Sequence, residues 1–254
     1  MYNQRKERCR RMQIKGTCKC CGKEYMRAGM LKHLNSCPKR ECEGGSQEYF
    51  DLLVTSDYPK GYWLMVEIKA DALLQDLDQF LRDIWLECCG HLSSFSIGGF
   101  DYDSYTGNSF GWGRPTRSQV IKLSKVLQPG DVISYEYDFG SSTDLTIKVL
   151  NIHKGEKRRE KTKLLARNNM PKHICDVCGK EEAAYINSFI YSEETPVFFC
   201  RHCGAKYTGE DYDEEEIDDE DIGLEEEGEV YLLSVCNSPR MGVCGYEGSF
   251  KYPD

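Results

Sequence analysis

The stretch that decides the fold runs from Asp71 to Phe95 and reads DALLQDLDQFLRDIWLECCGHLSSF. Apolar residues recur in it at spacings of three and four, which is the period of an amphipathic α-helix with one face against a core. These residues are Leu73, Leu74, Leu77, Phe80, Leu81, Ile84, Trp85 and Cys88. Asp71 is a suitable N-cap, and Gly90 permits the left-handed turn that ends many helices. The stretch therefore predicts one long helix that faces the core.

The segments on either side of this helix are typical of β-hairpins. Residues 49–56 and 63–70 are rich in β-branched and aromatic side chains and are separated by turn residues. Residues 133–139 and 145–152 form a second such pair, in which polar and aromatic residues alternate and Phe139 is expected on the buried face. Residues 93–100 indicate a further strand, and 117–127 a short helix. Together they predict an α+β fold, with a mostly antiparallel sheet packed on one long helix.

The cysteine content restricts where the chain can fold. There are 14 cysteines in 254 residues, and the basic N-terminus lacks the apolar segment of a signal peptide. No apolar run approaches the roughly 18 residues that a membrane helix needs. We therefore expect a cytoplasmic protein with no membrane partner. In a reducing compartment, clustered cysteines bind metals more often than they form disulfides.

Two groups of cysteine and histidine have the spacing of zinc ligands. Cys18 and Cys21 are followed by His33 and Cys37, which predicts a small N-terminal zinc finger, packed by Tyr25 and Leu31. Two CxxCG knuckles, at Cys175 with Cys178 and at Cys200 with Cys203, predict a C-terminal zinc ribbon. Each knuckle glycine is expected to let backbone N–H groups point at the thiolates. The sequence thus predicts two structural zinc ions per chain. It leaves open whether other thiols replace or add to these ligands, namely Cys20, Cys42, Cys236 and Cys244.

These motifs suggest three regions. Residues 1–42 form a basic segment with the finger, 47–168 an α+β core, and 169–254 the ribbon with an acidic loop at 210–229. This loop carries 14 carboxylates and no basic residue, so removing it from the net charge of −9 leaves +5 for the rest of the chain. Its order of acidic residues is not that of an EF-hand, which favours a flexible charged segment over a calcium site.

Basic residues gather in two places that suit an anionic partner. Residues 1–42 carry a net +9, and 154–167 a net +5. Such densities favour phosphate contacts with a nucleic acid or a ribonucleoprotein, and a solvated basic face is the alternative. The candidate contact residues are Arg8, Arg10, Arg11, Arg27, Lys32, Arg158 and Arg159. The acidic loop is expected to compete for this surface, and a protein partner also remains open.

Signs of catalysis are few, and no catalytic residue is assigned. The P-loop, HExxH and GxSxG motifs are absent. His91 is typical of a packed or capping histidine, and Cys88 and Cys89 of buried thiols. The sequence therefore favours a non-enzymatic interaction protein. The alternative is an enzyme or a small-ligand binder that uses a polar cleft around His91, Asp101, Asp103, Tyr135 and Asp138.

Four passages resemble the plasmid pRiA4b open-reading-frame-three-like family, also known as the insertion-element passenger TnpR family. They are the helix with its trailing HLSSF, YEYDFG at 135–140, the passage at 165–179, and NSPRMGVCGY at 237–246. The resemblance spans roughly residues 50–254. It implies an α+β core, here with zinc modules, and an association with mobile elements. A resolvase activity, which the TnpR label would imply, is not supported, because no segment supplies a serine among clustered arginines.

Overall fold

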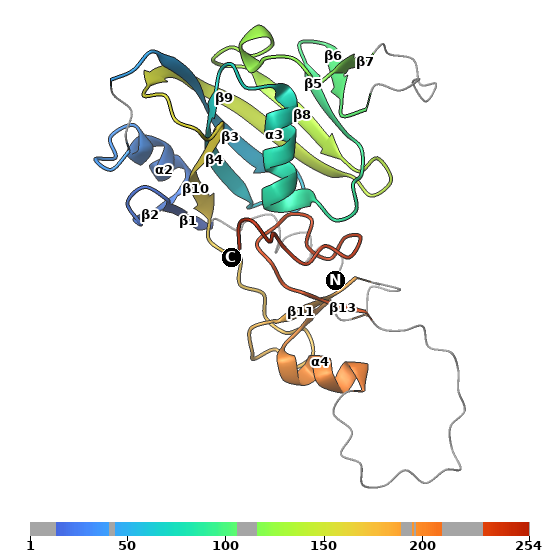
Figure 1. The fold of residues 1–254 in the computed structure, drawn as a ribbon. Coiled ribbons are helices and arrows are strands. Elements are labelled where there is room, and N and C mark those ends of the chain that lie inside the picture. The colour runs from blue at the N-terminus through green and yellow to red at the C-terminus, as the bar shows by residue number, and fades with distance from the viewer. Residues whose placement is uncertain are drawn as a thin grey trace, which may run out of the picture.

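The structure is a computed structural model that describes residues 14–40, 44–105, 116–188, 195, 197–209 and 231–253. A ten-stranded sheet dominates it, in the order β2-β1-β10-β4-β3-β9-β8-β5-β6-β7 (Figure 1). All neighbouring strands are antiparallel except β6 and β7, which are parallel. The strands are β1 (Lys15–Cys18), β2 (Glu24–Met26), β3 (Gln47–Ser56), β4 (Trp63–Lys69), β5 (Ser93–Ile97), β6 (Phe100–Asp103), β7 (Thr116–Ser118), β8 (Val132–Tyr137), β9 (Thr143–Gly155) and β10 (Thr162–Asn168).

Both predicted hairpins are confirmed. The first is β3 with β4, which pair from Tyr49 opposite Lys69 to Thr55 opposite Trp63. The second is β8 with β9. The two hairpins join through the pairing of β3 with β9, and their inward side chains form one core. The structure is thus a mixed α+β fold in which the sheet predominates.

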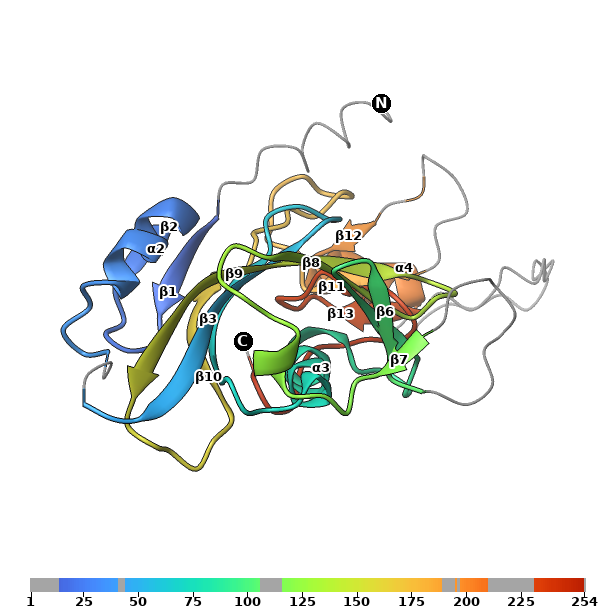
Figure 2. The ribbon, with the colours of Figure 1, turned by 90° about the horizontal axis from the view of Figure 1, so that it is seen from above.

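The main helix lies in the concavity of the sheet, as Figure 2 shows. The pairing of β3 with β9 skips Leu150, and the pairing of β4 with β10 skips Leu165, which places bulges in β9 and β10. Such bulges bend and twist a strand, which favours a sheet that curves around a helix. Helix α3 (Leu74–Leu81) presents its apolar face to this curved sheet.

The prediction of one long helix is wrong. Helix α3 continues only as a π-helical turn, η1 (Arg82–Leu86), in which the Glu87 N–H bonds to the Arg82 carbonyl at 3.0 Å. This wider turn buries three consecutive side chains, Ile84, Trp85 and Leu86, and the chain becomes extended at Glu87. The helix also starts later than expected, where the Leu73 N–H donates to Asp76 Oδ2 at 2.8 Å.

The prediction of a short helix at 117–127 is also wrong, since this segment contains part of β7 and a 3-10 turn at Leu123–Lys125. Its backbone makes internal bonds only in that short turn, and several of its other groups bond to residues around the start of α3. The Leu74 N–H donates to the Ile121 carbonyl at 2.8 Å, and the Leu123 N–H to the Ala72 carbonyl at 2.8 Å. Tertiary pairing therefore overrides the local helical pattern.

Phe139 was expected on the buried face of its strand, but 52% of it is exposed and Asp138 is buried instead. Strand β8 ends at Tyr137, and Asp138 has a φ of 65°. In this left-handed conformation Asp138 Oδ1 accepts hydrogen bonds from the N–H groups of Gly140 and Ser141, at 3.1 and 3.2 Å. At this turn the alternation of buried and exposed side chains is reversed, so the Asp138 carboxylate points inward and Phe139 is exposed.

The two predicted modules flank the core. The finger contributes β1, β2 and helix α2 (Arg27–Leu34), and β1 pairs with β10, so the finger extends the main sheet. The C-terminal region has a separate sheet in the order β12-β11-β13, with β11 (Tyr185–Asn187), β12 (Phe198–Phe199), β13 (Leu232–Ser234) and helix α4 (Arg201–Thr208). The acidic loop at 210–229 lies outside the described residues. Among the described helices, none has the length and apolar character needed to cross a membrane.

Candidate metal centres and a basic groove

The four predicted finger residues, Cys18, Cys21, His33 and Cys37, converge on one point. Cys18 ends β1, Cys21 follows in a tight turn, and His33 lies on α2. Their donor atoms all lie within 4.8 Å of one another, with 4.0 Å between the sulfurs of Cys18 and Cys37 and 3.2 Å between Cys21 Sγ and His33 Nε2. Tetrahedral zinc with bonds of about 2.3 Å to sulfur holds two sulfurs about 3.8 Å apart. The donor set therefore fits one such ion.

The finger packs against the sheet as well as on itself. Tyr25 stacks on the His33 ring with 4.5 Å between centroids, which orients the imidazole. Tyr25 and Leu31 are partly buried, as predicted, while the fully enclosed finger side chains are Met30 and Leu34. Cys20 lies beside this cluster but outside the group of four donors, and Cys42 lies outside the described residues.

The four predicted ribbon residues, Cys175, Cys178, Cys200 and Cys203, also converge, with their sulfurs all within 4.8 Å of one another. Cys200 caps α4, where its sulfur accepts a hydrogen bond from the Cys203 N–H at 3.4 Å. Burial by itself would raise the pKa of Cys175, yet backbone N–H groups at Cys178, Cys200 and Val177 lower that pKa to about 7. Backbone groups thus favour thiolate at this position, as a metal ligand requires.

The two knuckle glycines serve different purposes. Gly179 has a φ of 65° and makes the tight turn expected after Cys178. Gly204 is helical, and a Cβ at this position would lie 2.9 Å from the Tyr185 ring. The second glycine therefore allows α4 to pack closely on β11, a role that the motif alone did not reveal.

The structure brings the two basic segments of the sequence to one hollow, which we call the basic groove. It has a volume of about 740 Å³ and lies between the finger and the loop before β10. The finger lines it with Asn35, Ser36, Cys37, Pro38 and Arg40, among others, and the loop and β10 with Lys157, Arg158 and Lys163. The antiparallel pairing of β1 with β10 produces this juxtaposition, because the rest of the finger follows the end of β1 and the basic loop precedes the start of β10.

The residues predicted to contact nucleic acid differ in their exposure and in their contacts. Arg27 and Lys32 are exposed on α2, and Arg159 is exposed in the basic loop. Arg158 is half-buried and forms an ion pair with Glu67, and its guanidinium lies 4.4 Å from the centre of the Tyr49 ring. Arg8, Arg10 and Arg11 lie outside the described residues. The groove therefore adds two cations that the sequence did not single out, Lys157 and Lys163.

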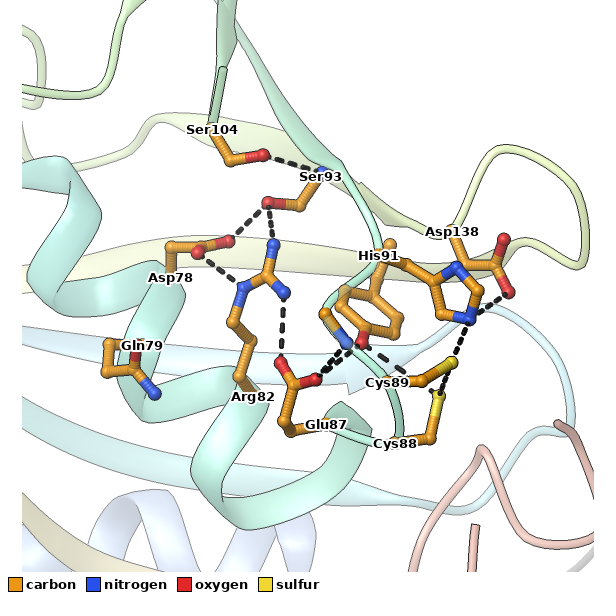
Figure 3. A network of polar contacts seen from close by, with 12 residues as sticks. Asp78, Gln79, Arg82, Glu87, Cys88, Cys89, His91, Ser93, Ser104 and Asp138 are labelled. Atoms are coloured by element: carbon orange, nitrogen blue, oxygen red, sulfur yellow. Dashed lines mark hydrogen bonds and ion pairs between the residues drawn. The ribbon is translucent and has the colours of Figure 1, made fainter. Parts of the chain in front are cut away.

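A buried polar network connects the end of the helix to the sheet (Figure 3). Arg82 Nε donates to Asp78 Oδ2 at 2.6 Å, and its other nitrogens donate to Glu87 and Ser93. These hydrogen bonds give partners to two buried charged groups, the guanidinium of Arg82 and the carboxylate of Asp78. Arg82 also lies over the ring of Tyr137, whose other neighbour is the guanidinium of Arg240; each is 4.8 Å from the ring centre.

The polar cleft predicted as an alternative site divides into two places. His91 and Asp138 do approach one another, with 3.5 Å between Nε2 and Oδ2. Asp101, Asp103 and Tyr135 border a separate hollow of about 640 Å³ that includes neither of them. Beside His91 the structure places Cys88, Cys89 and Cys244, a grouping that sequence reasoning missed. Cys88 and Cys89 were expected to be buried thiols, but Cys89 is exposed and Cys88 is half-buried, as is His91.

The fold and these clusters define a class: an α+β protein with several cysteine–histidine groups able to hold metal ions. The family model for plasmid pRiA4b ORF-3-like proteins matches residues 54–221, and the chain belongs to this family. The match ends before the passage at 237–246. No curated protein sequence matches the chain. Among solved structures, the protein of unknown function MM3350 from Methanosarcina mazei Go1 is similar, with 16% identity and a TM-score of 0.39 over 50% of this chain and 70% of its own.

Proposed function

We propose that the protein is a cytoplasmic, zinc-binding interaction protein that contacts a nucleic acid or a ribonucleoprotein along the basic groove. Finger and ribbon each hold one zinc ion in this proposal, because each offers four sulfur and nitrogen donors at tetrahedral separations. Closed sets of four protein ligands are typical of structural zinc. Thiols in such sets need a reducing compartment, which supports the cytoplasm. The plasmid reading frame in the family's name supports an association with mobile elements.

The observation that carries the nucleic-acid contact is the convergence of two basic segments, far apart in sequence, on one groove. Lys157 is exposed and Lys163 half-buried there. Arg40 and Arg158 already neutralise Glu67 and Asp51, so they shape the groove rather than supply free charge. The exposed Arg27, Lys32 and Arg159 extend the basic surface beyond the groove. Contacts of this kind recognise phosphates rather than base sequence.

Removing the groove lysines tests this proposal. The double variant Lys157→Ala/Lys163→Ala is titrated against labelled single-stranded RNA and duplex DNA at two salt concentrations. We expect weaker binding and a smaller slope of log affinity against log salt, by about one unit for each lost phosphate contact. Lys122→Ala/Lys125→Ala removes the same charge near the 3-10 turn and is the control. Equal affinities and slopes for wild type and both variants would contradict binding along the groove, and no binding by any of them would contradict nucleic-acid contact and favour a protein partner.

A second candidate function, an enzyme or a small-ligand binder, is supported by the approach of His91 to Asp138. Its other predicted members border a different hollow, so the five residues do not form one cleft. Residues of both predicted basic segments line the groove, whereas the five residues predicted for the cleft lie in two separate places. The geometry therefore favours the interaction protein.

A further inference from the structure

A third cluster of metal-binding side chains lies where the C-terminal segment meets the helix end. Cys88, Cys89 and His91 follow η1, and Cys244 comes from the passage at 237–246. Cys89 Sγ lies 2.8 Å from His91 Nε2 and 3.5 Å from Cys244 Sγ. His91 Nε2 and Cys244 Sγ are 3.3 Å apart, and the sulfurs of Cys88 and Cys89 are 3.6 Å apart. Three of the four donors are neighbours in sequence, and the fourth, Cys244, lies 153 residues after His91.

These separations suit a shared metal ion better than a disulfide. A disulfide needs about 2.05 Å between its sulfurs, far less than the 3.5 Å between Cys89 and Cys244. Around tetrahedral zinc, two sulfurs lie about 3.8 Å apart and a sulfur and a nitrogen about 3.5 Å apart. The finger, which has the spacing of a zinc motif, shows comparable separations of 4.0 and 3.2 Å.

Neighbouring groups complete the environment that thiolate ligands need. Arg240 is fully buried, and its Nη2 lies 3.4 Å from Cys88 Sγ. The same nitrogen donates to Asp138 Oδ2 at 2.6 Å, which fixes the guanidinium in place. Three thiolates, a neutral histidine and a dication sum to one negative charge. The Arg240 guanidinium, which also pairs with Asp138, lies beside this charge and donates a hydrogen bond to Cys88 Sγ. Hydrogen bonds to ligand atoms orient and tune a metal centre, so Arg240 is suited to this position.

The backbone gives independent support. Among the described residues, the non-glycine residues with positive φ are Asp138 at 65° and Cys244 at 52°. Both border this cluster, through the contacts of Asp138 and Cys244 with His91. Such conformations are uncommon for residues other than glycine and persist where surrounding interactions impose them. Binding of Cys244 to an ion would supply such an interaction.

We propose that Cys88, Cys89, His91 and Cys244 bind a third metal ion of the zinc class, which fastens the C-terminal segment to the core. Cys89 and Cys244 are exposed, whereas the finger and the ribbon each bury two of their cysteines. The third centre therefore opens to solvent and releases its ion to a chelator before the other two. Its integrity couples the position of the C-terminal segment to zinc supply.

The test compares metal content in the full-length chain, prepared without oxygen in the presence of zinc. We expect Cys244→Ser and Cys89→Ser each to carry one zinc ion fewer than the wild type by elemental analysis. Cys236→Ser, which removes a thiol of the same segment outside the three clusters, serves as the control and keeps the wild-type content. Equal metal content in wild type, Cys89→Ser and Cys244→Ser would overturn the proposal.

Thiol alkylation of the wild type, read by peptide mass spectrometry, does not depend on a variant that folds. In the zinc-loaded protein we expect the exposed Cys89 and Cys244 to react slowly. Brief treatment with a chelator should make these two cysteines reactive before Cys178 or Cys203. Alkylation of Cys89 and Cys244 at the same rate with and without zinc would refute the third centre, as would a disulfide between them in reduced preparations.

Discussion

At the scale of single residues, Glu67 shows how the fold accommodates a buried charge. Its carboxylate is almost fully enclosed and receives Arg40 at 2.9 Å, His153 at 3.1 Å and Arg158. Burial by itself would raise the pKa of Glu67, but hydrogen bonds from His153, Arg40 and Arg158 hold that pKa well below its usual range. Asp51 differs, because burial outweighs its partner Arg40 and raises its pKa.

This difference gives Glu67 a defined effect on acid stability. A lowered native pKa stabilises the fold above the unfolded pKa of about 4.3, and this contribution disappears as pH falls towards the native pKa. We expect Glu67→Gln to reduce the free energy of unfolding at pH 7 by about 3 kcal/mol, as for a broken buried ion pair. The loss should shrink between about pH 5 and pH 3, measured by urea unfolding.

The surface pair of Glu182 with Lys172, 3.4 Å apart and largely exposed, provides the control. Glu182→Gln should change stability by less than about 1 kcal/mol at any pH, because exposed pairs contribute little. If Glu67→Gln unfolds with the same pH dependence as the wild type, the ionised state of Glu67 does not stabilise the fold.

Residue identities were predictable where the chemistry is local in sequence. Cys18 and Cys21, like Cys175 and Cys178, are separated by two residues within one turn, so spacing alone indicates that they share a metal ion. The third cluster has no such signal. Cys89 and Cys244 are brought together only when the passage at 237–246 docks on the core, through bonds such as Ser238 Oγ to the Trp85 carbonyl at 2.6 Å.

At the scale of secondary structure elements, periodicity predicted the buried face of α3 but not its length. Leu74, Leu77 and Leu81 are fully buried, as the pattern required. After Leu81 the chain widens into a π turn, where a spacing of 3.6 residues no longer describes which side chains face the core. The hairpins were predictable because β3 with β4, and β8 with β9, are neighbours in sequence. The strands that flank the hairpins, β10 beside β4 and β5 beside β8, are placed by tertiary pairing, as is β1 beside β10.

The pairing of β1 with β10 depends on Gly16. A Cβ at this position would lie 2.4 Å from both the Arg167 carbonyl oxygen and the Trp63 ring. We expect Gly16→Ala to separate β1 from β10 and to cost about 1–3 kcal/mol, the usual range for overpacking. Hydrogen exchange should show weaker protection of the Lys19 and Asn169 amides, which donate across this pairing to the carbonyls of Leu165 and Lys15.

Gly29→Ala is the matched control for this change. A Cβ there meets only the Tyr25 side chain, at an ordinary 3.5 Å, and Gly29 lies within α2. Alanine favours helix over glycine by about 1 kcal/mol, so stability should be equal or higher. Similar hydrogen exchange in the two variants would show that β1 does not need the close contact at Gly16.

At the scale of the whole molecule, the finger and the ribbon join different parts of the chain to one core. The finger extends the sheet through β1, and after the ribbon the chain returns so that Asn237 Nδ2 donates to the Asn168 carbonyl at 2.8 Å. The sequence suggested three separate regions, because composition and motifs do not show how the ends of these regions pair with one another. In the structure the end of β10 meets both modules, since Asn168 lies opposite Gly16 and contacts Asn237.

In the proposed function, finger and ribbon hold zinc ions on which the fold depends. The most direct test is the zinc content and thermal unfolding of the full-length chain, with and without a strong chelator. We expect at least two zinc ions per chain and a large fall in melting temperature on chelation, because binding energies of about 10 kcal/mol or more contribute to folding in such modules. Cys200→Ser should lose one ion and destabilise the C-terminal region. Fewer than one zinc ion per chain, or melting that the chelator leaves unchanged, would contradict the claim.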